Sequence, residues 1–268
     1  EAVRKSGMMM AADSIPDKMV ISLKGKNALY KNDLMMLEMI DQCNWTRPIY
    51  VALTVGDENY MNLGDNFIQE GLARRISPFT TNIDGKPLPG VKSFDTEKTY
   101  NNVMHKFRFG GVDAPGIYLD ETVSRMCYTH RRLLSQLVLN LIAEGQDDKA
   151  KRVLDKCEKE LPSYNIPHDF SSGSLDLAKG YAYTGQPKKA QQLVDQLWQK
   201  SCQYMQWYCS FDGAYFSASQ RECMLHLYIM QQILDLQDII DEKKSEQKER
   251  QLQGYMSLFE AKGGSYGE

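Results

Sequence analysis

Side chains that could do chemistry gather around one predicted β-strand, residues 49–55. Asp57 and Glu58 come directly after this strand, where α/β folds often place the groups that contact a ligand. An arginine stacked on an aromatic face can hold a sugar or a carboxylate. One arginine and three aromatic residues lie in or beside the same strand, namely Trp45, Arg47, Tyr50 and Tyr60. These six residues form a candidate binding cluster. The alternatives are that the two acids cap a helix and that the others pack in a core.

A second aromatic-rich stretch covers residues 198–216. Its candidates for contacting a peptide or a glycan are Trp207 and Tyr208, because their rings combine a large apolar face with a polar group. Alternatively, this stretch interlocks with the helix that follows it.

The sequence predicts no catalytic residue, no metal site and no cofactor. The histidines lack ligand spacing, and no hydrolase elbow, nucleotide-binding loop or dinucleotide fingerprint is present.

The six cysteines contain no C-x-x-C pair, so they are interpreted as small buried residues, although an even number permits disulfides in an oxidising compartment. The net charge of −3 and the absence of a concentrated basic face argue against a nucleic-acid partner. The histidines are His105, His130, His168 and His226.

The chain has no uninterrupted apolar run of the eighteen or so residues that span a bilayer. It begins with Glu1 and not with methionine, so we expect a piece of a longer protein or a processed product.

Residues 1–93 are predicted to form a small mixed α/β module. A β-hairpin is expected over residues 19–30, then a largely buried, methionine-rich helix capped by Asp33. Residues 49–55 are expected to be a central strand, because the run is apolar and nearly continuous. Short helical turns at 57–63 and 65–70, a second strand at 72–79 and a hairpin through Asp84 and Gly85 toward Val91 complete the module.

Residues 94–262 are predicted to be helical, with helices starting after Asp95 and after Asp120. An internal repeat lies within this region, because residues 145–150 and 185–190 nearly match at an offset of forty. Each copy joins two helices through Gly145 or Gly185 and brings in a small residue, Ala150 or Ala190. This is the tetratricopeptide pattern, in which stacked helix pairs bury a shared apolar seam.

The ideal tetratricopeptide repeat has about 34 residues. The forty-residue offset therefore implies about six extra residues, which 163–170 can supply. A third long helix capped by Ser217 or Ser219 is expected to close the stack, and residues 263–268 to form a tail. The predicted fold class is α+β, a small α/β module followed by a tetratricopeptide-like helical-repeat domain.

Several segments between residues 33 and 200 resemble a family of multi-spanning membrane proteins of Bacteroidetes that is similar to protein O-mannosyltransferases. The most specific segment is Asn44-Trp45-Thr46-Arg47-Pro48-Ile49-Tyr50, within residues 37–52. The further matching segments are 70–75, 102–111, 118–121, 150–162 and 166–169.

The resemblance implies a membrane glycosyltransferase that uses a lipid-linked sugar and carries an extracytoplasmic soluble domain. This chain would be that domain, on the periplasmic face of the inner membrane, with the upstream membrane region as its partner. It would bind an acceptor protein or glycan without being catalytic, because the catalytic acid of such enzymes lies in the membrane region.

Two other functions remain open at this point. One is a stand-alone repeat adaptor for protein partners. The other is a carbohydrate-active enzyme that uses carboxylates such as Asp57, Glu58 or Glu70, for which a suitably spaced acid pair is required.

Overall fold

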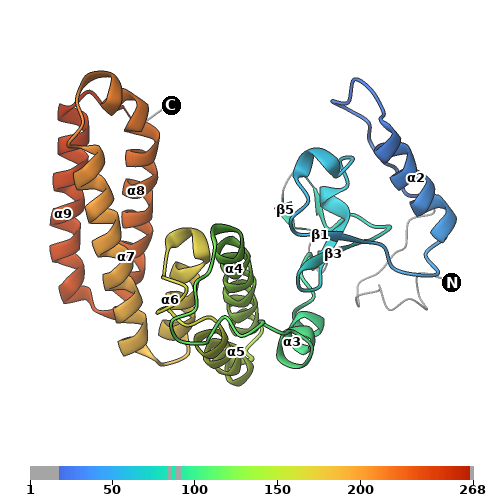
Figure 1. The fold of residues 1–268 in the computed structure, drawn as a ribbon, viewed down its shortest axis with the longest axis horizontal. Helices are drawn as coiled ribbons and strands as arrows, with labels where there is room; N and C mark the ends of the chain where they lie inside the picture. Colours follow the sequence, from blue (N-terminus) through green and yellow to red (C-terminus); the bar gives the residue numbers. More distant parts are fainter. Residues whose placement is uncertain (1–17, 84–85, 88–91, 266–268) are drawn as a thin grey trace. The chain divides into compact units, whose positions relative to one another are not determined.

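The computed structural model describes residues 18–83, 86–87 and 92–265. The chain divides into two compact units, Glu1–Phe107 and Arg108–Glu268. The first unit holds the strands, and the second holds the long helices (Figure 1). This division differs by one helix from the predicted boundary at 93/94, because α3 (Thr96–His105) belongs to the first unit.

The first unit contains a three-stranded antiparallel sheet of order β1-β3-β2. Its core holds Ile40 of helix α2 together with residues around the sheet, among them Tyr60, Met61, Phe67 and Ile76. The elements of this unit are α2 (Lys31–Cys43), β1 (Tyr50–Ala52), the 3-10 turns η1 (Asp57–Asn59) and η2 (Gly64–Asn66), β2 (Phe67–Gln69), β3 (Ala73–Ile76), the paired strands β4 (Asn82–Ile83) and β5 (Lys86–Pro87), and α3.

The expected central strand at 49–55 is a short edge strand. β1 covers only Tyr50–Ala52 and pairs on one side, with β3, which is itself the middle strand. The turn predicted at 57–63 and the strand predicted at 72–79 are present in shorter form, as η1 and β3. The turn predicted at 65–70 was wrong over most of its length, because η2 ends at Asn66 and Phe67–Gln69 form strand β2, which pairs with β3.

The hairpin expected over residues 19–30 has a turn but no strands. The carbonyls of Ser22 and Lys24 bond to a side chain and not to a partner strand. They accept from Asn62 Nδ2 at 2.8 and 3.0 Å. The prediction was wrong because this competing partner lies about forty residues away in sequence.

Helix α2 is less buried than its methionine-rich sequence suggests. Leu34, Met35 and Met39 are each more than half exposed, and only one face of the helix reaches the core. Asp33 caps this helix from the third position of its first turn, where its carboxylate accepts the backbone N–H of the N-cap residue Tyr30 at 3.0 Å. The same carboxylate accepts the ammonium of Lys26 at 2.8 Å.

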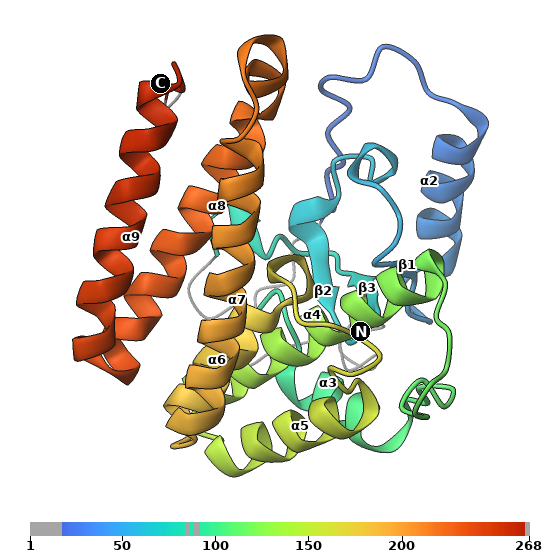
Figure 2. The same ribbon diagram turned by 60° about the vertical axis from the view of Figure 1, so that its left-hand side comes forward.

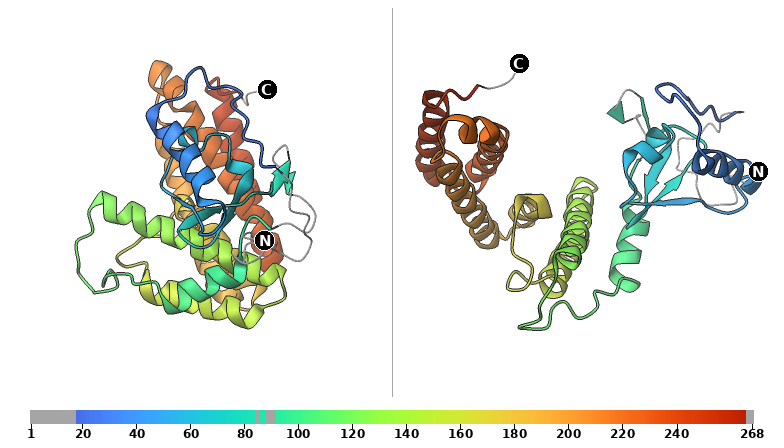
Figure 3. Two further views of the ribbon diagram at one scale, coloured as in Figure 1. Left: turned by 90° about the vertical axis from the view of Figure 1, so that its right-hand side faces the viewer. Right: turned by 45° about the horizontal axis from the view of Figure 1, so that its top comes forward.

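The second unit is a succession of helices in which each packs on the next (Figures 2 and 3). Helix α4 contacts both α5 and α6, and the contacts continue from α6 to α7, α8 and α9. The predicted start after Asp120 is confirmed, since its carboxylate accepts the backbone N–H of Val123 at 2.8 Å. Asp95 caps α3 of the first unit in the same way. The helices are α4 (Glu121–Ala143), α5 (Asp147–Glu160), α6 (Ser174–Tyr183), α7 (Pro187–Tyr208), α8 (Gly213–Ile240) and α9 (Glu242–Ala261).

The two glycine turns of this unit have nearly the same backbone geometry. Gly145 and Gly185 have φ angles of 71° and 78°, a left-handed conformation that glycine adopts without strain. The next residue in each turn donates its N–H across the turn at 2.8 Å, and both Ala150 and Ala190 are fully buried. The hairpins α4/α5 and α6/α7 are therefore alike at their turns, while their tetratricopeptide repeat nature stays a prediction.

Residues 161–173 connect these hairpins, and Arg131 of α4 holds this linker in place. The guanidinium is fully buried and donates to the carbonyls of Leu161, Ile166 and Pro167 at 2.9, 2.6 and 3.0 Å. The short turn η3 (Phe170–Ser172) and Gly173 form the end of the linker. The backbone of Gly173 lies so close to α4 that a Cβ there would be 2.9 Å from Cα of Arg132, which leaves no room for a side chain.

The closing element consists of two helices and starts earlier than predicted. Asp212 is the N-cap of α8, and Ser217 and Ser219 lie within the helix, where their hydroxyls bond to carbonyls four residues back. A serine inside a helix satisfies its hydroxyl in this way, so its presence does not mark a helix start. Parts of three sequence predictions lie outside the described residues, namely the N-terminal segment 1–17, the turn at Asp84 and Gly85 with residues 88–91, and the end of the tail at 266–268.

Candidate functional site

The aromatic and arginine candidates of the first unit have separate environments. Trp45 is partly buried against the core, Arg47 is exposed, and Tyr60 is 7% exposed. The Tyr60 hydroxyl donates to the carbonyl of Val55 and accepts from Arg74 at 2.8 Å, with the Arg74 guanidinium over its ring. Arg74, which the sequence analysis did not select, thus supplies the cation–π contact that was expected of Arg47.

Asp57 and Glu58 lie in the first turn of η1, and both are exposed. Gly56 is the N-cap of this turn, and no side chain caps it through a hydrogen bond, so the capping interpretation stays a prediction.

Tyr50 belongs to a network around the buried carboxylate of Glu70. Its hydroxyl donates to Glu70 Oε2 at 2.7 Å, and Lys98 Nζ lies 2.5 Å from the same oxygen. Arg75 Nε lies 2.8 Å from Oε1, with both side chains almost fully buried. Glu70 is therefore neutralised by two cations, and its oxygens are not available as a general acid or base.

The pKa values in this network follow from the same contacts. Burial and the bond to Glu70 raise the pKa of Tyr50. Burial lowers the pKa of Lys98, but its bonds to Glu70 and Tyr50 outweigh that effect and raise it overall. Both groups therefore keep their protons at neutral pH, which fits a structural ion cluster.

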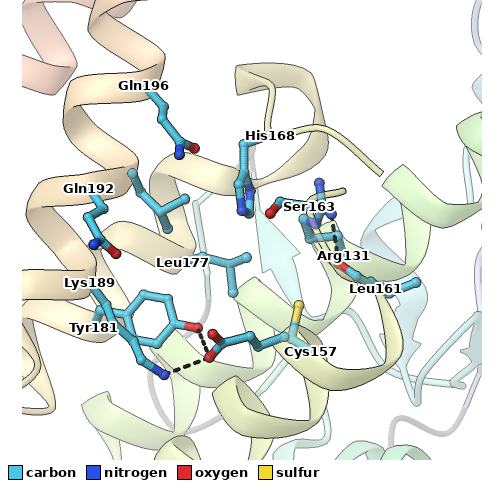
Figure 4. Close-up of a pocket in the computed structure, with 12 residues that line it drawn as sticks. Arg131, Cys157, Leu161, Ser163, His168, Leu177, Tyr181, Lys189, Gln192 and Gln196 are labelled. Atoms are coloured by element: carbon cyan, nitrogen blue, oxygen red, sulfur yellow. Dashed lines mark hydrogen bonds and ion pairs between the residues drawn. The ribbon is translucent and has the colours of Figure 1, made fainter. Parts of the chain in front are cut away.

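The second unit contains a pocket of about 140 Å³ beside the linker, between α5, α6 and α7 (Figure 4). Arg131, Leu161 and Leu177 lie on its inner wall, and His168 points into it from the linker. Helix α7 contributes side chains at four-residue and three-residue spacing. The residues from this helix are Lys189, Gln192, Leu193 and Gln196.

The cations of the pocket are already neutralised or hydrogen-bonded. Lys189 Nζ lies 2.6 Å from the carboxylate of Glu158, which also accepts the hydroxyl of Tyr181 at 3.5 Å (Figure 4). The N–H groups at the end of the Arg131 guanidinium bond to linker carbonyls. The carboxamides of Gln192 and Gln196 remain at the rim, where both side chains are exposed.

His168 is neutral in this pocket. Burial and the charge of Arg131 lower its pKa to about 4. Its Nδ1 lies 2.9 Å from the Ser174 hydroxyl. The neutral ring therefore adds a polar group to the pocket without adding charge at pH 7.

The aromatic stretch forms a row of ring contacts at the other end of α7. Phe170 of the linker and Tyr204 both contact His226, with ring centroids 5.8 and 4.5 Å apart. The contacts continue through Tyr208 and Trp207, and Trp207 is 54% exposed. We call this set the aromatic row, and it comprises Phe170, His226, Tyr204, Tyr208, Trp207, Phe211 and Tyr215.

The row combines both sequence interpretations. His226 of α8 is buried, and its ring stacks on Tyr204 of α7, as the interlocking interpretation expects. Trp207 and Tyr215 are exposed, so they can also contact a ligand. Sequence reasoning missed the pocket, whose residues come from five elements, namely α4, α5, the linker, α6 and α7. Gln192 and Gln196 carry the one local signal, a pair spaced four residues apart on one helix face.

Cysteines and metal ligands add no further site to the described part of the chain. All six cysteines are free thiols and five are buried, in agreement with their interpretation as small core residues. Among residues 18–83, 86–87 and 92–265, no three His, Cys, Asp or Glu side chains are grouped so that they could hold a metal ion.

Comparison with known proteins connects the first unit to one family. Residues 1–98 match the model of a family described as TMEM260-associated domain 2. The match covers less than half of the 268 residues. No curated protein matches the chain, and no solved structure does. In the part of the chain that the structure describes, no helix is both long and apolar enough to cross a membrane.

Proposed function

We propose that this chain is the extracytoplasmic accessory part of a membrane glycosyltransferase and that its helical unit holds the acceptor protein or glycan. The parent enzyme would transfer a sugar from a lipid-linked donor, with its catalytic residues outside this chain. The match of residues 1–98 to a TMEM260-associated domain supports the association with a membrane protein. The resemblance of residues 37–52 to the family similar to protein O-mannosyltransferases supports the glycosyltransferase role.

The observation that carries the binding role is the pocket of the second unit. Polar side chains from the linker and α7 converge on a cavity of about 140 Å³, next to apolar side chains of α5 and α6. Ligand pockets are commonly about 300–1,000 Å³ and combine apolar walls with a few convergent polar groups, so this smaller cavity has the composition of a binding site with room for one end of a ligand.

The carboxylate-enzyme alternative has little support in the geometry. Glu70 is bound by Tyr50, Arg75 and Lys98. Asp57 and Glu58 are exposed on a 3-10 turn. The adaptor alternative requires the same binding surface, so it differs only in the partner attached to this chain.

The proposed function is tested in the full-length parent protein, in membranes supplied with a lipid-linked donor. Replacing Gln192 and Gln196 by alanine should raise the KM for the acceptor and leave the KM for the donor unchanged. The matched control replaces Gln247 and Gln253, two exposed carboxamides of α9 that do not line the pocket. A gene that joins no membrane-spanning segment to this chain would overturn the proposal and favour the adaptor.

A further inference from the structure

One face of α7 connects the pocket to the aromatic row. Its side chains follow each other at intervals of three or four residues, which places them on the same side of the helix. The span from Lys189 to Trp207 is eighteen residues, or about 27 Å at the rise of an α-helix. We call this surface the α7 stripe, and its members are Lys189, Gln192, Gln196, Lys200, Tyr204 and Trp207.

The linker runs beside the middle of this stripe. His168 points into the pocket, Asp169 pairs with Lys200 in the middle, and Phe170 contacts the aromatic row through His226. Three consecutive linker residues therefore lie between the pocket and the aromatic row, beside the middle of the stripe.

The charges along the stripe are compensated inside the protein. Lys189 pairs with Glu158 and Lys200 pairs with Asp169. Arg131, which lines the pocket, keeps its charge, but it is fully buried and its terminal N–H groups bond to linker carbonyls. On the α7 stripe itself a ligand therefore meets carboxamides, aromatic faces and paired lysines.

These groups suit a neutral saccharide chain better than a polypeptide. The apolar C–H face of a sugar ring stacks on an exposed aromatic ring, and neighbouring sugar hydroxyls pair with the donor and acceptor of a carboxamide. An extended peptide needs partners for its backbone N–H and C=O groups along its whole length. On the stripe only Gln192 and Gln196 offer carboxamides for that purpose.

We propose that the α7 stripe binds a neutral oligosaccharide, with one end in the pocket and a later sugar unit stacked on Trp207. The inference rests on the proposed function for its pocket and names the chemical class of the ligand held there. It also assigns a role to the aromatic row, about 27 Å from the far end of the pocket.

The test measures binding of neutral hexasaccharides of mannose, glucose and N-acetylglucosamine to the whole 268-residue chain by calorimetry. At least one hexasaccharide should bind, and Trp207→Ala should weaken it about tenfold. Trp207→Phe should retain much of the affinity, because it keeps a stacking ring. The Gln192→Ala, Gln196→Ala double variant should weaken both the hexasaccharide and the corresponding disaccharide, whereas Trp207→Ala should leave the disaccharide unchanged.

The control is Tyr228→Ala, which removes an exposed aromatic ring of α8 outside the aromatic row. Equal losses for Tyr228→Ala and Trp207→Ala would overturn the inference, as would the absence of binding by all three hexasaccharides. If an acceptor peptide binds at the pocket while the hexasaccharides do not, the saccharide inference fails and the proposed function survives. If the pocket variant changes neither binding nor sugar transfer, both fail.

Discussion

Replacing Arg131 by methionine should destabilise the second unit by separating the linker from α4. The guanidinium is fully buried and donates three hydrogen bonds of 2.6 to 3.0 Å to linker carbonyls, with a longer contact of 3.4 Å to Ser172 Oγ. In the variant, an unbranched apolar side chain fills the part of the space nearest α4, and the three carbonyls lose their donor.

The size of the effect follows from two opposing contributions. Hydrogen bonds to a charged group are worth about 1.5 to 3 kcal/mol each, which gives roughly 5 to 9 kcal/mol for three. Removing the charge recovers a desolvation cost of several kcal/mol, because no carboxylate is among the hydrogen-bond partners of the Arg131 guanidinium. The expected net loss is therefore about 3 kcal/mol. Burial lowers the pKa of Arg131, which agrees with a guanidinium that is costly to desolvate.

The assay is urea unfolding of the whole chain, followed by far-ultraviolet circular dichroism, which reports mainly the helices of the second unit. Arg125→Met is the matched control, because Arg125 lies on the same helix but is largely exposed and should change the stability by less than about 0.5 kcal/mol. A loss for Arg131→Met that is no larger than that of the control would refute the view that this side chain anchors the linker.

Three further predictions concern the second unit. The pKa of His168 is about 4 in the folded protein and about 6.5 when unfolded, so the free energy of unfolding should fall by up to roughly 3 kcal/mol as the pH drops from 6.5 to 4. In His168→Gln, the urea concentration at the unfolding midpoint should depend less on pH over this range. Gly180→Ala should lower the melting temperature, because its Cβ would lie 2.6 Å from a Val138 methyl, whereas Gly254→Ala on the open face of α9 should raise it through helix propensity; equal signs would contradict the packing explanation. His226→Phe should raise stability by about 1 kcal/mol in urea unfolding, because Nδ1 is buried without a partner and a phenyl ring preserves the stacking with Tyr204; a loss would show that the nitrogen has a role in the fold.

Helices were predictable from this sequence because their signals are local. Asp95 and Asp120 cap the helices that follow them, and Gly145 and Gly185 end helices in the left-handed conformation. Each signal lies within a few residues of the structure that it determines. The same reasoning failed for residues 19–30, whose carbonyls bond to the distant side chain of Asn62.

The site was predictable only in part, and for the same reason. Trp207 and Tyr208 were selected from a run of aromatic residues, and both lie in the aromatic row. Tyr50 was selected as well, but its role depends on Glu70 and on Lys98, 48 residues away. A hydrogen-bond network that joins distant segments leaves no periodic pattern in the sequence. Only the structure shows which of these residues lie close together.

The proposed site lies where the predicted repeat departs from its ideal length. Counted against the predicted 34-residue repeat, about six residues are extra, and they fall in the linker that Arg131 binds. A shorter connection would bring α5 and α6 together without the segment that carries His168, Asp169 and Phe170. Since these three residues contact the pocket, the α7 stripe and the aromatic row in turn, the extra length is what turns a helix stack into a surface with a defined pocket. The anchoring of the linker and the binding of a ligand should therefore be coupled, and Arg131→Met should weaken hexasaccharide binding even at urea concentrations where the helices remain folded.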